Sequence, residues 1–176
     1  MAPFPKIAPP LAFVVGRLPA PPARLGLTLL SRRVAANHPG IVERLGEHVE
    51  KSFALDPTDL PLVLVLTIPD GRPHVAIARD AGGADCRIAG RLSALLALVH
   101  GRADGDALFF SRDLVVEGDV AAALALRNAV DDAELDLTEE FAGLLPPLAG
   151  PIAAASRLAE KLTGVALRRF EGEGAW

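Results

Sequence analysis

The side chains that could carry out chemistry are few in this chain of 176 residues, and their spacing matches no metal or acid–base site. Two imidazoles on one helical face need i,i+4 spacing to bind a metal ion, and no two of the four histidines have it. Acidic clusters at 104–106 and 131–134 could bind calcium or transfer protons, but solvated loops and helix ends explain them better. We therefore expect no metal ion.

Nucleophilic and phosphate-binding motifs are also missing. Cys86 is the single cysteine, which excludes a disulfide or a cysteine-based zinc site within one chain and fits a reducing compartment. Neither Ser93 nor Ser111 lies in the Gly-x-Ser-x-Gly turn that exposes a catalytic serine. Gly82-Gly83 is not followed by the Lys-Ser/Thr step of a phosphate-binding loop. The sequence thus predicts a protein that is not an enzyme and needs no cofactor.

Composition and charge narrow the choice of partners. Apolar residues make up 51% of the chain and charged residues 23%, which is enough for one domain with a large core. Residues 1–51 carry seven Lys and Arg against three acids, whereas residues 52–150 carry seven against sixteen. The acidic centre, the lack of Tyr and the single Trp argue against nucleic acid as a partner. Residues 151–176 carry four Lys and Arg against three acids, and the two basic ends of the chain either contact an anionic membrane or form solvated helix faces.

The start of the chain does not look like a membrane anchor. Its apolar run at residues 11–15 is bounded by prolines and Gly16, and is far shorter than the roughly 20 residues that cross a bilayer. No clear small-x-small cleavage site follows it. We expect a cytoplasmic protein, with peripheral contact at the inner membrane as a further option.

Proline and helical periodicity divide the chain. Residues 1–21 should form an irregular leader, because each proline fixes its own φ and restricts the residue before it. Apolar residues at helical spacing predict amphipathic helices over 22–38 and 41–51. We expect the domain to cover residues 22–145, followed by a C-terminal amphipathic helix and tail at 146–176.

Several apolar runs in the middle of the chain predict strands. After a turn at Asp56-Pro57, residues 62–68 are apolar almost throughout, so both faces of this strand should be covered. Asp70-Gly71 signals a hairpin into a second strand at 74–79, and a third strand at 85–89 would complete a meander.

Further elements follow this meander. A short helix is expected at 91–100, and residues 108–119 predict two short strands that turn near Arg112-Asp113. Gly118 allows the turn into the next helix at 120–134, and Asp119 caps that helix. The fold class is therefore α+β, with a five-stranded sheet covered by helices.

The large apolar content leaves two options for the interior. Either helices fill the space against the sheet, or they leave an apolar cavity. Small residues expected to face the interior permit both, and these are Ala76, Ala78, Ala121, Ala122 and Ala125. An alkyl chain gains roughly 0.8 kcal/mol per CH₂ on leaving water, so a lipid could bind in such a cavity without a polar anchor.

A pattern within residues 106–135 is more specific. It consists of Leu108-Phe109-Phe110, Arg112, Leu114-Val115-Val116-Glu117-Gly118-Asp119, Leu124, Asn128, Asp131 and Glu134-Leu135. The segment resembles the most recognisable stretch of the sterol-carrier-protein type-two lipid-binding domain family, and looks closest to its bacterial UbiT branch. The order of elements before it is similar as well.

The resemblance implies a mixed five-stranded sheet, helices on one face and a hydrophobic tunnel between them. It implies a non-catalytic accessory protein that sequesters a long-chain isoprenoid, such as a polyprenylated quinone precursor, or a phospholipid. Such a protein would present its lipid to an iron-sulfur hydroxylase protein pair in oxygen-independent ubiquinone biosynthesis. The expected lipid-binding residues are Leu64, Leu66, Val75, Ile77, Leu95, Phe109, Phe110, Leu114, Val116 and Leu124.

Two other functions stay open. A protein-interaction module with a filled core could dock onto biosynthetic enzymes through its acidic surface. The residues expected to contact such a partner are Arg112, Asn128, Asp131 and Glu134. An enzyme acting on a lipid would need a polar pair inside the cavity, for which Ser111, or His74 near Arg79, are the only candidates.

Overall fold

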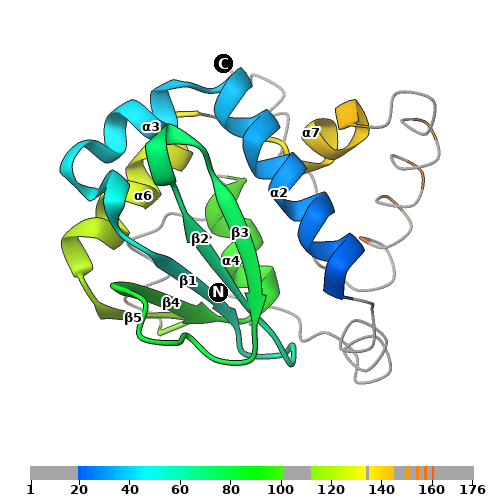
Figure 1. The fold of residues 1–176 in the computed structure, drawn as a ribbon. Coiled ribbons are helices and arrows are strands. Elements are labelled where there is room, and N and C mark those ends of the chain that lie inside the picture. Colours follow the sequence, from blue (N-terminus) through cyan, green and yellow to red (C-terminus); the bar gives the residue numbers. More distant parts are fainter. Residues whose placement is uncertain are drawn as a thin grey trace, which may run out of the picture.

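The fold is a single sheet covered by helices. The computed structural model describes residues 20–100, 112–133 and 135–144, with the single positions 150, 154, 157 and 160 (Figure 1). The strands lie in the order β3-β2-β1-β4-β5; β1 and β4 are parallel, and the other neighbours are antiparallel. Their bounds are β1 (Phe53–Pro57), β2 (Val63–Thr67), β3 (His74–Ala78), β4 (Cys86–Gly90) and β5 (Leu114–Gly118). The predicted α+β class with a five-stranded mixed sheet is confirmed.

The described helices include those predicted from apolar periodicity and one further helix, at 137–144, that was not predicted. They are α2 (Ala20–Asn37), α3 (Gly40–Leu45), α4 (Leu92–Val99), α6 (Val120–Asp132) and α7 (Leu137–Leu144), with short 3₁₀ turns η1 (Gly46–Glu50) and η2 (Pro69–Gly71). The helix predicted over 41–51 changes from α to 3₁₀ at Gly46, whose φ of 51° lies outside the helical region. Residues 1–19 and most of the predicted C-terminal helix lie outside the described residues.

The central strand β1 was not predicted, and the prediction that the strands at 62–68, 74–79 and 85–89 form a meander is wrong. Asp56 and Pro57, interpreted as a turn, form the end of β1, which pairs with β2 on one side and β4 on the other. β4 therefore does not follow β3 in the sheet. A five-residue strand that contains Asp and Pro has a weak local signal, and its place is set by the two neighbours that pair with it.

The strands at 108–119 are only partly described. β5 accounts for the second of the two predicted strands, and residues 108–111 lie outside the described part of the chain. Arg112 lies in the turn immediately before β5 with a φ of 60°, as expected for a tight reversal there.

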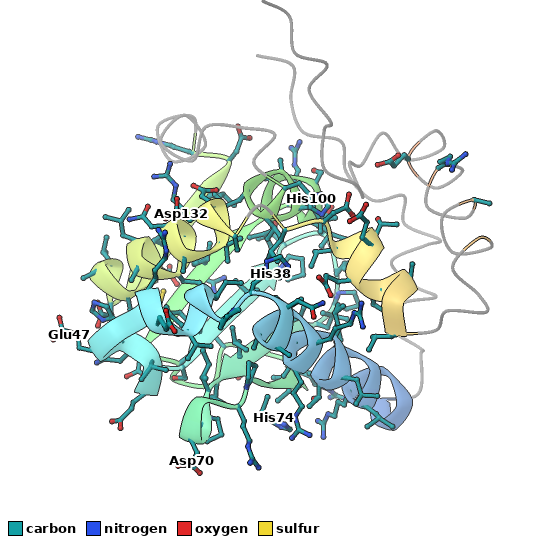
Figure 2. All side chains as sticks on the ribbon, turned by 90° about the horizontal axis from the view of Figure 1, so that it is seen from above. His38, Glu47, Asp70, His74, His100 and Asp132 are labelled. Atoms are coloured by element: carbon teal, nitrogen blue, oxygen red, sulfur yellow. The ribbon has the colours of Figure 1, made fainter. Side chains whose placement is uncertain are left out.

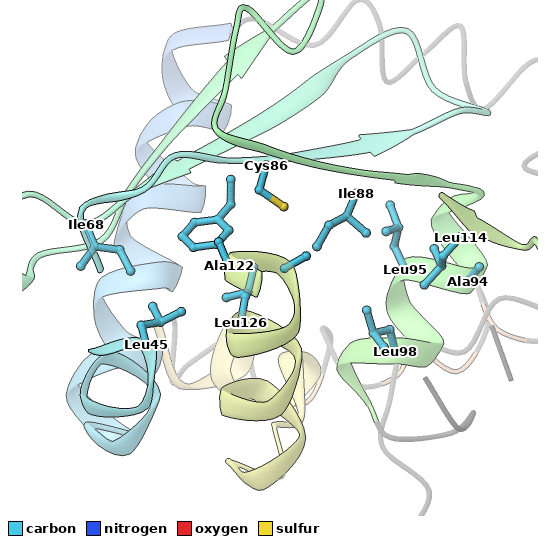
Figure 3. Close-up of a cluster of buried hydrophobic side chains, with 12 residues drawn as sticks. Leu45, Ile68, Cys86, Ile88, Ala94, Leu95, Leu98, Leu114, Ala122 and Leu126 are labelled. Carbon is cyan, nitrogen blue, oxygen red and sulfur yellow. The ribbon is translucent and has the colours of Figure 1, made fainter. Parts of the chain in front are cut away.

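One face of the sheet makes the hydrophobic core. Phe53, Cys86 and Ile88 point from the strands toward the helices and are almost fully buried. Figure 3 shows the side chains of this cluster between the sheet and α3, α4 and α6, and Leu45 on α3 is 1% exposed. Burial of such aliphatic and aromatic side chains contributes roughly 1.5–3 kcal/mol each.

The opposite face of the sheet is different in character. Arg87 on β4 donates through Nε to Asp56 Oδ2 at 2.9 Å and also pairs with Glu117 on β5. Val115 on β5 is 48% exposed, and Val65 on β2 is half-buried. On β2 itself, Val63 is buried and Val65 is half-buried on this face, so the expectation that both faces of the strand at 62–68 are covered is met in part.

The junction between β5 and α6 agrees with the sequence analysis. Asp119 is the N-cap of α6, and its side chain accepts a hydrogen bond from the Ala122 N–H at 3.0 Å. Gly118 has a φ of 82°, and a Cβ there would lie 2.3 Å from the backbone oxygen of Asp85. Gly118 is thus required both by its conformation and by the close approach of β4.

We predict that Gly118→Ala destabilises the fold by more than Gly83→Ala. Both glycines have positive φ, which costs another residue about 1–2 kcal/mol, but a Cβ at Gly83 would meet nothing within 4 Å. Only Gly118→Ala adds a clash with backbone. Urea unfolding should show this difference in the free energy of unfolding, and equal losses in the two variants would contradict the steric argument.

Candidate functional site

An apolar cavity lies between the sheet and its helical cover. Its volume is about 260 Å³, somewhat below the roughly 300–1,000 Å³ of pockets for drug-sized ligands. The sheet side is formed by Leu55, Leu64, Leu66, Val75 and Ile88. The helices contribute mainly Leu27, Leu30, Val34, Ile41, Val42, Leu45, Leu95, Leu98, Val99, Leu126 and Val130, and the chain around the start of α7 contributes Leu135 and Leu137.

The partial exposure of the sheet leucines follows from this cavity. Leu55, Leu64 and Leu66 face the helices, and yet they are only half-buried. Side chains in a filled core are enclosed by neighbours at close-packed density. These leucines instead border empty volume, so the described interior is not completely filled by the protein's own side chains.

Two of the five alanines expected to face the interior do so. Ala76 and Ala78 alternate with the cavity-lining Val75 and therefore lie on the opposite face of the sheet, and Ala121 is exposed. Ala122 is fully buried on α6 and packs in the core cluster, while Ala125 is half-buried. None of these five alanines lines the cavity, which is bounded mainly by leucine, isoleucine and valine side chains.

Four of the predicted lipid-binding residues line the cavity, and these are Leu64, Leu66, Val75 and Leu95. Ile77 is half-buried outside the lining, and Leu114 and Val116 belong to the core cluster or pack against it. Leu124 is 47% exposed and does not line the cavity, since the buried face of α6 is formed by Ala122, Ala123, Leu126 and Ala129. Phe109 and Phe110 lie outside the described residues.

The residues expected to contact a protein partner do not form one described cluster. Arg112 is exposed in the turn before β5, and Asn128 is exposed on α6. Asp131 is half-buried and pairs with Arg127 one turn earlier, with 3.3 Å between Oδ2 and Nε. Glu134 lies outside the described part of the chain. Docking through these residues stays a prediction.

Sequence reasoning missed the contribution of the first two helices. Leu30 and Val34 on α2 and Ile41 on α3 line the cavity, although they were interpreted only as the apolar faces of amphipathic helices. Their helical spacing could have indicated this role. Leu55 could not have been found, because the strand that carries it was not predicted.

A buried carboxylate on α7 holds this helix in place beside the cavity. Glu140 is 8% exposed, and its Oε2 lies 3.0 Å from Arg33 Nε and accepts from Asn37 Nδ2 at 2.9 Å. His38 Nε2 lies 3.2 Å from Oε1, and Figure 2 shows His38 beyond the end of α2, toward α7. The Leu137 N–H also donates to Nε2 of the buried His100 at 3.4 Å. These polar contacts hold α7 against α2 and α4.

Nothing in the described part of the chain suggests a catalytic centre. It contains no group of three His, Cys, Asp or Glu residues that could hold a metal ion. Burial, and then the charges of Asp119 and Asp85, raise the pKa of the Cys86 thiol to about 11, which keeps it protonated and weakly nucleophilic near neutral pH. No described helix combines the length and apolar character that a membrane span requires.

The comparisons with known proteins agree with this architecture. The family model of the SCP-2 sterol transfer family matches residues 28–131, more than half of the chain, and the chain belongs to this family. No curated protein matches it. The resemblance to a sterol-carrier domain is therefore confirmed at the level of the family.

Two solved structures that align with this chain are a ubiquinone synthesis protein, which shares its fold, and a sterol carrier protein, which aligns less well. A structure titled "UbiJ-SCP2 Ubiquinone synthesis protein" aligns over 67% of this chain and 97% of its own, with 23% identity and a TM-score of 0.54. Sterol carrier protein 2 from Yarrowia lipolytica, in its apo form, aligns over 60% of this chain and 87% of its own, with 18% identity and a TM-score of 0.44.

We predict that Glu140→Ala loosens α7. The substitution leaves the half-buried Arg33 without this carboxylate and removes an acceptor from the exposed Asn37, and the loss around Arg33 costs about 1–3 kcal/mol. Faster amide hydrogen exchange in residues 137–144 and a lower free energy of unfolding would show this. Glu139→Ala is the matched control, because Glu139 is exposed and its loss should stay within about 0.5 kcal/mol. Equal effects would contradict the fastening role of Glu140.

The pKa of Cys86 gives a second prediction. In the folded protein at pH 8, the thiol should react with a disulfide reagent far more slowly than in urea, because it is both buried and protonated. Release of the coloured thiolate from the reagent measures the rate. Fast reaction in the folded state would show that the core opens readily around β4.

Proposed function

We propose that this protein is a non-catalytic lipid carrier, which holds the alkyl tail of a lipid in the cavity between the sheet and its helices. The observation that carries the proposal is the apolar lining, to which the sheet and five helices contribute. Transfer of roughly six methylene groups from water would contribute about 5 kcal/mol at 0.8 kcal/mol each. Membership of the SCP-2 sterol transfer family supports this role.

The lipid we propose is a polyprenylated quinone precursor, with a phospholipid as the alternative. The resemblance to the UbiT branch and the fold shared with a protein titled as a ubiquinone synthesis protein support this choice. A cavity of about 260 Å³ would hold only part of a polyprenyl chain, so the rest would have to extend beyond it through the proposed tunnel. Presentation to an iron-sulfur hydroxylase pair in the cytoplasm, near the inner membrane, is the corresponding cellular role.

Blocking the cavity tests the carrier function. Leu64→Trp places an indole in the volume that Leu64 now borders, so binding of a fluorescent fatty acid should fall about tenfold or more. Leu124→Trp is the matched control, because Leu124 is 47% exposed on α6 and should leave binding unchanged. Circular dichroism checks that both variants are folded. Undiminished binding by folded Leu64→Trp would overturn the proposed site.

The identity of the lipid needs a separate experiment. Protein purified from cells grown without oxygen should release a polyprenylated phenol or benzoate on solvent extraction, detected by mass spectrometry. Recovery of phospholipid alone would support the carrier role and contradict the quinone precursor.

A further inference from the structure

One charged side chain lies among the described residues that line the cavity. It is Arg127 on α6, whose side chain is 15% exposed. The other polar side chain in the lining, Ser31 on α2, donates its hydroxyl hydrogen to the backbone oxygen of Thr28 at 3.0 Å. The apolar stem of Arg127 borders the cavity, so its guanidinium is the charged group closest to it and would turn toward the cavity to meet the polar end of a lipid whose tail occupies the apolar volume.

The chemistry of a guanidinium favours one kind of polar end. An apolar wall cannot distinguish lipids by their head groups, whereas burying a head group without a hydrogen-bonding partner is costly. A guanidinium carries five N–H donors in a planar fork, which matches the two oxygens of a carboxylate. It is also permanently charged, so its hydrogen bonds to a carboxylate are about twice as strong as those to a neutral acceptor.

Asp131 is a partner of Arg127 that a ligand carboxylate can replace. Its Oδ2 lies 3.3 Å from Arg127 Nε, and its side chain is 35% exposed. A ligand carboxylate could take over contacts with Arg127 while Asp131 turns toward water, so that the guanidinium keeps an anionic partner throughout. Asp131 then competes with the ligand for the same cation.

We propose that Arg127 binds the carboxylate of a single-chain lipid acid whose tail fills the cavity, and that Asp131 opposes this binding. The inference rests on the proposed carrier function and adds a preference for acids over neutral lipids. It also assigns opposite effects to two neighbouring residues of α6. A purely structural ion pair would not produce effects of opposite sign, since removing either partner would then weaken the fold alike.

The test compares dodecanoic acid with dodecanol at neutral pH, by displacement of a neutral fluorescent lipid from the full chain. Wild type should bind the acid about tenfold tighter than the alcohol, because hydrogen bonds to charged groups are the stronger ones. Arg127→Met keeps the apolar stem, so it should lose this preference and bind the alcohol as before. Asp131→Asn should bind the acid several-fold tighter than wild type, with no change for the alcohol.

Arg87→Met is the matched control. Arg87 is also a half-buried, ion-paired arginine, but it lies on the opposite face of the sheet and does not line the cavity. It should keep the preference for the acid. Equal affinity of wild type for acid and alcohol would overturn the role of Arg127 while leaving the carrier function intact, whereas binding of neither lipid would refute both. If Arg127→Met does not fold, an unchanged ratio of the two affinities in Asp131→Asn overturns the proposal by itself.

Discussion

Apolar contact between one face of the sheet and the helices above it stabilises this fold. The same layer is incompletely packed in one region, and the cavity lies there. Leu45 on α3 and Phe53 and Cys86 on the sheet are enclosed almost completely, whereas Leu55, Leu64 and Leu66, on the same face of the sheet as Phe53, are not. The close-packed part supplies the stability, and the loosely covered part provides space. A protein that stores apolar cargo needs both, because an empty apolar volume destabilises the protein that contains it.

A polar cluster at the starts of β1 and β4 supports the parallel pairing of these two strands. Asp85 accepts hydrogen bonds from the Ser52 N–H at 2.8 Å and from the Ser52 hydroxyl at 2.7 Å, which lowers the pKa of this carboxyl. The Asp119 N–H donates to the Asp85 backbone oxygen at 2.8 Å, and Lys51 Nζ lies 3.5 Å from Asp119 Oδ2. The starts of β1, β4 and α6 thus meet at one point, which supports the register of β1 and β4, whose Leu55 and Ile88 line the cavity.

Elements that follow from a local sequence pattern were predicted, whereas a strand whose conformation depends on pairing with its neighbours was not. α2, α4 and α6 follow from helical periodicity, and the hairpin of β2 and β3 follows from Asp70-Gly71. β1 was missed because its five residues include Asp56 and Pro57, and its strand conformation depends on ladders with β2 and β4. Of the residues predicted to bind lipid, Leu64 and Leu66 on β2 line the cavity, whereas Leu124 does not, because an apolar residue on a helix need not lie on its buried face.

Some helices around the cavity are held by apolar packing and one by polar contacts. This difference bears on where a ligand could enter. α3 and α6 are joined to the sheet by aliphatic packing around Leu45, Ala122 and Leu126, which water cannot replace without loss. α7 is held chiefly through Glu140, whose donors on and just after α2 can exchange protein for water at small net free energy. Phe141 on the same helix is 40% exposed, so little apolar burial opposes its movement. Local opening of the described cavity wall should therefore cost least at α7, where polar contacts rather than core packing close the apolar volume.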